Sequence, residues 1–399
     1  DAMANRLAAA LRANGIGHGD RVVLFLPNSV AMVISVFAVL KAGAVFVPVN
    51  ATTKREKLLY ILNDSEAVGL IADARGASQC CVGSFSDEAR FLKSIVVRQE
   101  DGFPGGEAGF LDFDAIQKTF PAEPLSGDTV ESDLACLIYT SGSTGEPKGV
   151  TSDHSNVVFA SGSIIQYLEN VEDDIVINVL PLSFDYGLYQ LLMTFRFGGT
   201  LVLENSFAFP HLILKRMEEE QVTGFPGVPT VFSMLLRSGL EHYDLRSLRY
   251  ITNTAAALPV SHIEELRRAF HWVRLYSMYG LTETKRTLYL PPEQLDRRPG
   301  SVGIPIPGTE AWIEDEQGNR LKPGDIGELV VRGPHVMRGY WKAPETSAKR
   351  FRTGPGGMRL CYTGDLFRMD DEGYFYFVGR KDDIIKSRGE KVSPREVEN

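Results

Sequence analysis

The chain has 399 residues, of which 44% are hydrophobic and 23% are charged, and its formal net charge is -9. This composition is typical of a globular protein long enough for two or three hydrophobic cores. The acidic balance argues against a nucleic-acid-binding protein, because no surplus of Lys and Arg is available to neutralise phosphates.

Cysteine and histidine usage argues against two kinds of site. The four cysteines, with Cys80 and Cys81 adjacent, fit neither a disulfide framework nor a metal-binding spacing, and they favour a reducing compartment, the cytoplasm. The seven histidines are scattered, so no structural zinc site is expected. The most apolar run, residues 30–49, is interrupted by Lys41 and Pro48, which fits a buried helix and a strand better than a membrane span.

The first 75 residues alternate between expected helices and strands. The helices are expected at 1–13, 29–41 and 53–62, the last of them capped by Thr53, and the strands at 22–26, 44–47 and 67–72. Such alternation implies right-handed crossovers and a parallel sheet covered on both faces by helices. Residues 76–130 are rich in Gly, Pro and charge, and we expect an irregular surface connection there.

A second alternating block follows a strand expected at residues 134–140. Its strands are expected at 175–179, 200–203, 222–226, 248–253 and 273–277, and its helices at 187–197, 210–221, 228–238 and 259–270. From about residue 301, short strands and turns follow, at 311–313, 315–318, 327–332 and 374–378. The expected fold class is α/β: two doubly wound mixed or parallel sheets flanked by helices, plus a small distorted β-barrel subdomain.

Residues 137–150 carry the strongest chemical signal. An apolar strand turns into a loop of hydroxyl and glycine residues and then a lysine: Thr140, Ser141, Gly142, Ser143, Thr144, Gly145 and Lys148. Glycines let backbone N–H groups turn toward an anion, hydroxyls add donors, and the lysine adds a positive charge, so the stretch predicts a triphosphate site. It is not a Walker A loop, because the Gly-Lys-Ser/Thr ending is missing. A plain Ser/Gly turn is the alternative interpretation.

Two later motifs suit other parts of a nucleotide. Tyr279 can stack on a purine, the hydroxyl of Thr282 can meet a phosphate oxygen, and Glu283 can hold magnesium. Asp365, in a tight turn, suits the two hydroxyls of a ribose. Each motif has a plainer interpretation when taken alone, as a turn with a solvated carboxylate. The charged run at 379–392 has the composition of a linker.

Together these motifs, in this order, resemble those of the adenylate-forming (AMP-binding) superfamily, which includes acyl-CoA synthetases, adenylation domains of nonribosomal peptide synthetases, and luciferases. The resemblance covers essentially the entire chain. It implies a large N-terminal AMP-binding domain at 1–379, with the β-rich subdomain at about 301–379, a hinge at 380–386 that contains Asp382, and the start of a truncated C-terminal domain at 387–399. We therefore expect a fragment of a longer protein, without the late catalytic lysine of the family's C-terminal domain.

The resemblance also implies roles for the motif residues. The implied nucleotide-binding residues outside the glycine loop are Thr254, Ala255, Ala256, Tyr279, Gly280, Thr282, Asp365 and Arg380. Tyr279 would contact adenine and Asp365 the ribose, assisted by Arg380. The implied catalytic residues are Lys148 at the β- and γ-phosphates, Thr282 at the α-phosphate and Glu283, which would also hold the metal. The family often has glycine where this chain has alanines at 255–257.

The substrate-binding residues that the resemblance implies are Phe184, Asp185, Tyr186, Tyr189, Gly227, Thr252, Met278 and Arg286. Acyl-CoA synthetases often carry Phe-His at the position of Phe184 and Asp185, whereas peptide-synthetase adenylation domains carry Phe-Asp, whose carboxylate binds the substrate α-ammonium. Asp185 therefore favours an amino acid; the alternative is an N-cap of the following helix. Lys285 and Arg286 are unusual beside an apolar pocket and would contact a carboxylate or sulfate, or face water.

The implied activity is ATP-dependent activation of a carboxylic acid to an acyl- or aminoacyl-adenylate, with release of pyrophosphate and then thioester formation. The implied cofactors are ATP and Mg²⁺, with CoA or a phosphopantetheine as thiol acceptor. The implied partners are a small carboxylic or amino acid and an acyl or peptidyl carrier protein, with no nucleic acid and no membrane span. Two alternatives stay open: an ATP-dependent phosphotransferase, which would release ADP, and a non-catalytic nucleotide- or acyl-binding module.

Overall fold

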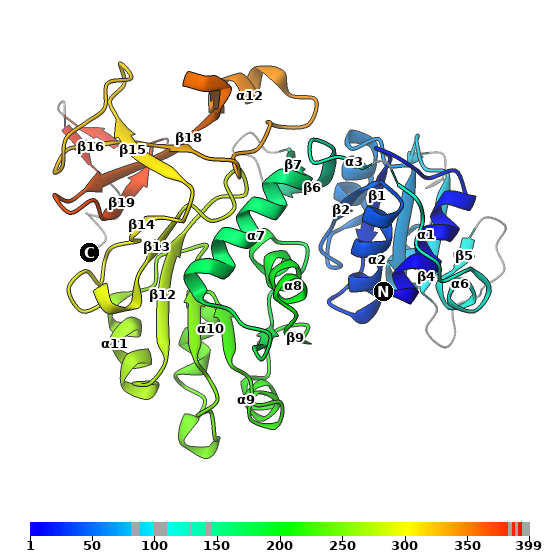
Figure 1. Ribbon diagram of the computed structural model, residues 1–399, viewed down its shortest axis with the longest axis horizontal. Helices are drawn as coiled ribbons and strands as arrows, with labels where there is room; N and C mark the ends of the chain where they lie inside the picture. Colours follow the sequence, from blue (N-terminus) through cyan, green and yellow to red (C-terminus); the bar gives the residue numbers. More distant parts are fainter. Residues whose placement is uncertain are drawn as a thin grey trace. The chain divides into compact units, whose positions relative to one another are not determined.

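The computed structural model describes residues 1–80, 88–98, 110–127, 129–140, 146–381, 385–387 and 390–392. The chain forms two compact units (Figure 1). The first consists of Asp1–Val157, Pro181–Leu191 and Tyr340–Lys342, and the second of Val158–Leu180, Leu192–Gly339 and Ala343–Asn399. Segments that are far apart in sequence therefore belong to the same unit.

The first unit contains a seven-stranded sheet in the order β5-β4-β3-β1-β2-β6-β7. Its strands are β1 (Arg21–Phe25), β2 (Val45–Pro48), β3 (Gly69–Asp73), β4 (Ser94–Arg98), β5 (Phe110–Asp112), β6 (Leu134–Thr140) and β7 (Lys148–Asp153). Its helices are α1 (Ala2–Ala13), α2 (Val30–Lys41), α3 (Arg55–Asp64), α4 (Ala74–Cys80) and α6 (Phe113–Thr119). All strand pairs are parallel except β6 with β7.

Apolar sequence runs account for the centre of this sheet. Val23, Val47 and Leu70 lie on neighbouring strands and are fully buried, as expected for strands covered on both faces. The side chain of Ser29 accepts a hydrogen bond from the backbone of Met32 and so begins α2, close to where the sequence predicts a helix.

Two predictions for this unit are wrong. Thr53 does not cap α3; the helix begins at Arg55, and the backbone of Thr53 instead donates to the carbonyl of Asn50 in a turn. Residues 76–130 are not merely an irregular connection, because β4, β5 and α6 extend the sheet there. The short apolar run at 94–98 carries the strand signal, but the charged segments on either side obscure it.

The second unit contains another seven-stranded sheet, in the order β14-β13-β12-β11-β10-β8-β9. Its strands are β8 (Ile175–Asn178), β9 (Thr200–Leu203), β10 (Gly224–Gly227), β11 (Tyr250–Asn253), β12 (Arg274–Tyr279), β13 (Leu288–Leu290) and β14 (Ile304–Pro305). The helices α9 (Pro210–Glu219), α10 (Pro229–Leu235) and α11 (Val260–Ala269) belong to this unit. The pairs formed among β8, β9, β10, β11 and β12 are all parallel. The pairs that β13 forms with β12 and with β14 are antiparallel.

Two helices have residues in both units, α7 (His154–Leu168) and α8 (Asp185–Phe197). The sequence predicts α8 but not α7, because the small residues at 160–163 weaken its apolar periodicity. The predicted doubly wound, mixed or parallel sheets are confirmed. None of the helices in the described part of the chain is long and apolar enough to cross a membrane.

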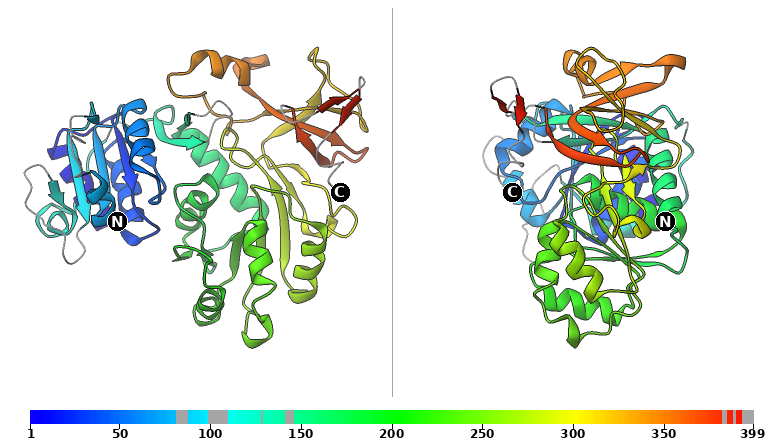
Figure 2. Two further views of the ribbon diagram at one scale, coloured as in Figure 1. Left: turned by 180° about the vertical axis from the view of Figure 1, so that it is seen from behind. Right: turned by 90° about the vertical axis from the view of Figure 1, so that its left-hand side faces the viewer.

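A curled sheet of short antiparallel strands completes the second unit, drawn in yellow to red in Figures 1 and 2. Its strands are β15 (Glu310–Glu314), β16 (Ile326–Arg332), β17 (Phe351–Thr353), β18 (Arg359–Met369) and β19 (Phe375–Arg380), beside the helix α12 (Pro344–Arg350). Register shifts in β16–β18 and β18–β19 pairing bend the sheet, as β-bulges do. Beyond it, β20 (Ile385–Ser387) pairs with β21 (Glu390–Val392).

The curled sheet confirms the predicted distorted barrel, although the strand predicted at 315–318 is wrong. The carboxylate of Asp315 accepts hydrogen bonds from the backbone of Gln317 and Asn319, and Gly318 has a left-handed φ of 84°. Such bonds close a turn. The alternation of polar and apolar residues is therefore interrupted by a turn that follows β15.

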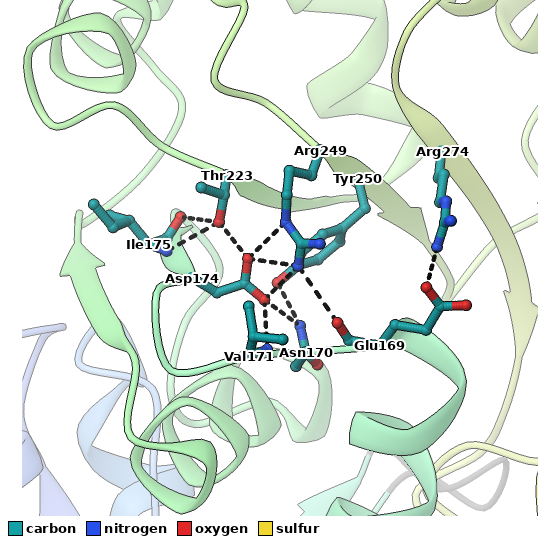
Figure 3. Close-up of polar contacts among 9 residues, drawn as sticks. All are labelled: Glu169, Asn170, Val171, Asp174, Ile175, Thr223, Arg249, Tyr250 and Arg274. Carbon is teal, nitrogen blue, oxygen red and sulfur yellow. Dashed lines mark hydrogen bonds and ion pairs between the residues drawn. The ribbon is translucent and has the colours of Figure 1, made fainter.

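The starts of three parallel strands in the second unit are joined by one buried carboxylate (Figure 3). The Asp174 side chain, just before β8, is 0% exposed. Thr223 and Arg249, just before β10 and β11, donate to it at 2.7 Å each. Burial acts to raise the pKa of Asp174, but hydrogen bonds from Thr223, Arg249 and their neighbours outweigh it, so the pKa lies below its ordinary value. This network stabilises the amino edge of the sheet.

Candidate active site

The predicted triphosphate loop connects β6 and β7, an antiparallel pair in which Thr140 lies opposite Lys148. Lys148 is half-buried, and its Nζ is 5.9 Å from the ring centroid of Tyr340. A Cβ on Gly149 would lie 3.1 Å from the Tyr139 ring, so the backbone packs closely against an aromatic side chain there. The remaining predicted residues of the loop lie outside the described residues: Ser141, Gly142, Ser143, Thr144 and Gly145.

A polar network that the sequence does not reveal holds this pair of strands. The hydroxyl of Tyr139 donates to Asp64 Oδ2 at 2.5 Å, and Trp341 Nε1 donates to the carbonyl of Asp64 at 2.9 Å. Tyr60 donates to the carbonyl of Pro147 at 3.1 Å. Both Tyr60 and Asp64 come from α3, so this helix fixes the base of the loop on either side.

Two of the predicted nucleotide-binding residues, Thr254 and Tyr279, lie at the carboxyl ends of parallel strands in the second unit. Gly227 pairs in register with Asn253, and Asn253 with Ser277, so β10, β11 and β12 end side by side. Thr254 and Tyr279 therefore lie at one edge of the sheet. This placement follows the expectation that ligands of doubly wound sheets bind beyond the carboxyl ends of strands.

Tyr279 and Asp365 meet although 86 residues separate them. The Tyr279 hydroxyl donates to Asp365 Oδ2 at 2.6 Å, and Arg380 Nε is 3.8 Å from Asp365 Oδ1. Asp365 is 6% exposed, and burial raises its pKa above the ordinary value, although the hydrogen bond from Tyr279 and the charge of Arg380 oppose this. The neutral hydroxyl of Tyr279 therefore holds one oxygen of the Asp365 carboxylate in place. Asp382, the predicted hinge residue, lies outside the described residues.

Glu283 occupies the loop after β12. Its side chain is 11% exposed, and Arg350 Nη2 is 3.9 Å from its Oε1. Thr282, beside it, is half-buried, and Gly280 leaves no room for a Cβ because the Lys285 carbonyl oxygen would be 2.0 Å away. No group of three or more His, Cys, Asp or Glu residues in the described part of the chain could hold a metal. Mg²⁺ would fit here with one carboxylate, its other ligands being phosphate oxygens and water, as Mg²⁺ commonly has.

The segment after β11 contains buried polar atoms without partners. Asn253 Oδ1 and Thr254 Oγ1 are buried, and neither has a hydrogen-bond partner among the described residues. Buried polar atoms are normally bonded, so these two indicate a place where a ligand supplies the partner. Ala255 has a left-handed φ of 71°, which glycine adopts more readily. Ala256, which follows, is exposed.

The predicted substrate residues are divided between the units. In the first, Phe184 is 56% exposed, and Tyr186 and Tyr189 are buried. An N-cap residue directly precedes the first residue of a helix, but α8 begins at Asp185 itself. The alternative role of Asp185 as an N-cap is therefore wrong.

In the second unit, Gly227, Thr252 and Met278 are buried on β10, β11 and β12. Tyr167 donates to Met278 Sδ at 2.9 Å, and a Cβ on Gly227 would lie 2.6 Å from the Phe232 ring. Strand register and packing therefore fix the positions of the residues on these three strands. Arg286 is also buried, at 3% exposed, as is Lys285, at 1% exposed, so the expectation that these two side chains face water is wrong.

Comparison with known proteins gives one consistent result. A family model described as AMP-binding enzyme matches residues 1–341. A long-chain-fatty-acid–CoA ligase of Bacillus subtilis (strain 168) is 33% identical over 420 residues, covering 98% of this chain and 73% of that protein. An L-proline–(L-prolyl-carrier protein) ligase of Pseudomonas fluorescens is 30% identical and covers 98% of this chain and 75% of that protein. The solved structure of the anthranilate CoA ligase AuaEII in complex with anthranoyl-AMP has a TM-score of 0.90 at 28% identity, covering 100% of this chain and 75% of that one.

Proposed function

The chain belongs to the AMP-binding enzyme family, and we propose that the acid it activates is an amino acid, recognised through Asp185. The predicted family and reaction class are confirmed: the protein is an acid–thiol ligase that activates a carboxylic acid as an adenylate. ATP and a thiol acceptor are the co-substrates of that reaction.

The reaction needs positioning and charge neutralisation more than proton transfer. A substrate carboxylate is already ionised at neutral pH and attacks the α-phosphorus of ATP, breaking its bond to the bridging oxygen of the departing pyrophosphate. In our proposal Lys148 binds the β- and γ-phosphates and Thr282 the α-phosphate, so that both oppose the charge that develops. Mg²⁺, bound at Glu283, would supply further charge neutralisation on the phosphates.

The nucleoside end is proposed to bind at the carboxyl edge of the second sheet. The main support is the hydrogen bond of 2.6 Å between Tyr279 and Asp365, which fixes the carboxylate. A fixed carboxylate can accept hydrogen bonds from both ribose hydroxyls. Asn253 and Thr254 offer buried polar atoms to a bound ligand at the same edge.

The proposal of an amino acid is carried by Asp185, a partly buried carboxylate in the first turn of α8. A partly buried carboxylate binds an ammonium group more strongly than an exposed one does. The relative that acts on proline is a carrier-protein ligase. A carrier-protein phosphopantetheine is therefore the thiol acceptor that we propose, with CoA as the competing acceptor.

The test compares each amino acid with its desamino analogue in ATP–pyrophosphate exchange. Asp185→Ala should lower kcat/KM for the preferred amino acid about 100-fold and change that for the desamino acid less than threefold, because only the former loses a charged contact. Glu56→Ala is the matched control, since Glu56 is also an acid in the first turn of a helix of the same unit. Equal activity with amino and desamino acids in both the Asp185→Ala and the parent protein would remove the ammonium-binding role.

A further inference from the structure

The regular pairing of β18 with β16 is interrupted at Asp365, the proposed ribose residue. Between the paired residues Tyr362 and Leu366, three residues of β18 lie opposite a single residue of β16. These three are Thr363, Gly364 and Asp365. A bulge of this kind bends the strand and changes the direction of its side chains, and bulges are frequent beside active sites. The backbone of the bulge therefore decides where the Asp365 carboxylate lies.

Hydrogen bonds to β16 hold the bulge where regular sheet pairing is missing. The hydroxyl of Thr363 donates to the Leu329 carbonyl at 2.9 Å, and the N–H of Gly364 donates to Glu328 Oε1 at 2.9 Å. Gly364 has a left-handed φ of 70°, and a Cβ there would lie 2.5 Å from Arg350 Nη1. A backbone N–H that loses its partner in a sheet needs another acceptor, and here the carboxylate of Glu328 supplies it.

The second oxygen of Glu328 connects the bulge to the end of β19. Glu328 Oε2 accepts from Lys381 Nζ at 2.9 Å, and the backbone of Lys381 donates to the Gly364 carbonyl at 2.8 Å. Both residues therefore contact the glycine that directly precedes Asp365. The side chain of Glu328 is 14% exposed, whereas that of Lys381 is 46% exposed. Because exposed ion pairs contribute little, we expect the hydrogen bond from Gly364 to matter more than the ion pair.

We propose that Glu328 is a positioning residue for the ribose of ATP, because it holds the backbone of Gly364 so that the Asp365 carboxylate meets both ribose hydroxyls. The inference rests on the proposed function, in which Asp365 binds the ribose. Tyr279 holds one oxygen of this carboxylate directly, whereas Glu328 holds the backbone of the same bulge. In this arrangement Glu328 acts through Asp365 and does not itself contact the nucleotide.

The test measures how strongly the enzyme prefers ATP to 2′-deoxyATP and 3′-deoxyATP, as the ratio of kcat/KM values in pyrophosphate exchange. Each analogue lacks one of the hydroxyls that Asp365 would bind. We expect the parent protein to prefer ATP about 30-fold and Glu328→Ala to reduce that preference to about threefold, because a displaced carboxylate no longer meets the hydroxyls. A loss of stability alone would leave the ratio unchanged, since it lowers kcat/KM equally for all three nucleotides.

A double variant tests whether Glu328 acts through Asp365. Asp365→Ala should reduce the preference for ATP to about twofold or less, because no carboxylate is left to accept from the ribose. Glu328→Ala combined with Asp365→Ala should show the same preference as Asp365→Ala alone, since the group that Glu328 positions is gone. Two independent roles would instead give a further loss in the double variant and overturn the proposal.

The matched control is Glu314→Ala. Glu314 is 7% exposed, lies in β15 of the same curled sheet, and accepts hydrogen bonds from Trp312 and Tyr362. Its removal therefore costs comparable contacts, but Glu314 does not accept from the bulge backbone. This variant should keep the parent's preference for ATP over both deoxy analogues.

Two conservative variants keep the test decisive if Glu328→Ala fails to fold. Glu328→Gln retains an oxygen that can accept from the N–H of Gly364, so it should keep most of the preference. Glu328→Asp keeps the charge but is one methylene shorter, so the preference should fall about fivefold because this hydrogen bond is stretched. Lys381→Met should change the preference less than about threefold, since the ion pair is half-exposed.

The outcomes separate this inference from the proposed function. If Asp365→Ala loses the preference while Glu328→Ala and Glu328→Asp keep it, Glu328 has only a structural part and the positioning role is overturned, but the proposed ribose site stands. If the parent protein does not distinguish ATP from either deoxy analogue, or Asp365→Ala keeps the parent's preference, Asp365 does not bind the ribose. In that case the nucleotide assignment of the proposed function fails together with the positioning role.

Discussion

The two edges of the parallel sheet in the second unit differ in whether their buried polar groups have hydrogen-bond partners. At the amino edge the carboxylate of Asp174 is fully buried and accepts several hydrogen bonds, including those from Thr223 and Arg249 (Figure 3). At the carboxyl edge Asn253 and Thr254 each bury a polar atom that has no partner among the described residues. The first edge stabilises the fold, and the second leaves binding capacity for a ligand.

The pKa values of Asp174 and Asp365 are also shifted in opposite directions. Hydrogen bonds lower the pKa of Asp174 in spite of burial, whereas burial raises the pKa of Asp365 in spite of its hydrogen bond from Tyr279. The carboxylate of Asp174 therefore stabilises the folded state at neutral pH, and that of Asp365 destabilises it. A carboxylate whose charge destabilises the folded state, as that of Asp365 does, is typical of a functional residue.

The largest effect on stability is expected from Asp174→Asn. Removing this charge leaves Arg249 without its partner and should cost about 2.5 kcal/mol, less than a completely buried pair because Arg249 is 43% exposed. Denaturant unfolding monitored by circular dichroism measures the loss. Since the pKa of Asp174 is lowered on folding, its contribution is present above the unfolded pKa of about 4 and is lost as the pH falls through the folded pKa.

A surface pair provides the control for Asp174→Asn. Asp244 also accepts from an arginine, Arg246, but both side chains are exposed. Asp244→Asn should leave the unfolding midpoint unchanged. Equal losses for the two variants would show that the network at the amino edge has no special part in stability.

At the carboxyl edge, Asp365→Asn should separate binding from stability. Loss of the proposed ribose contact should raise the KM for ATP about 20-fold, equivalent to about 2 kcal/mol, whereas the unfolding midpoint should stay the same or rise because a buried charge is removed. In the parent protein the KM for ATP should rise as the pH falls through the raised pKa of Asp365, at a higher pH than for an ordinary carboxylate. A variant that keeps the parent's KM and pH profile would contradict a role for Asp365 in nucleotide binding.

A smaller effect is expected from Tyr279→Phe, which removes the hydroxyl that orients Asp365. The KM for ATP should rise about fivefold, equivalent to about 1 kcal/mol, because a single hydrogen bond to a charged group is lost. Tyr362→Phe is the matched control, since Tyr362 also donates to a carboxylate, that of Glu314, in the curled sheet. If both variants raise the KM equally, the effect is general and not specific to the nucleotide site.

The smallest effect is expected at the backbone of the carboxyl edge. Ala255→Gly should stabilise the protein by about 0.5 kcal/mol, because relief of the left-handed φ of 71° exceeds the greater entropy of glycine in the unfolded chain. Ala256→Gly is the control; Ala256 has no left-handed φ, and its replacement should destabilise the protein slightly. Thermal unfolding of the two variants should therefore shift in opposite directions. Destabilisation by both would show that Ala255 is not strained.

Part of this arrangement could be predicted from the sequence, because the positions of strand ends follow from alternating helices and strands. The apolar strand before the glycine loop and the carboxyl-edge positions of Thr254 and Tyr279 are examples. The proximity of Asp64 to Tyr139 and of Glu328 to Gly364 could not be predicted, since each pair depends on packing between distant segments. The strands β4 and β5 were obscured by the charged residues around them.

In the proposed function, the carboxyl edge and the glycine loop take part in adenylation, in which the reacting phosphate of ATP is the α-phosphate. Exchange of labelled pyrophosphate into ATP, measured with and without amino, fatty and aryl acids, distinguishes reaction at the α-phosphate from transfer of the γ-phosphate. We expect exchange that depends on one carboxylic acid and is lost in Lys148→Ala. Formation of only ADP and phosphate, with no exchange for any acid, would contradict it.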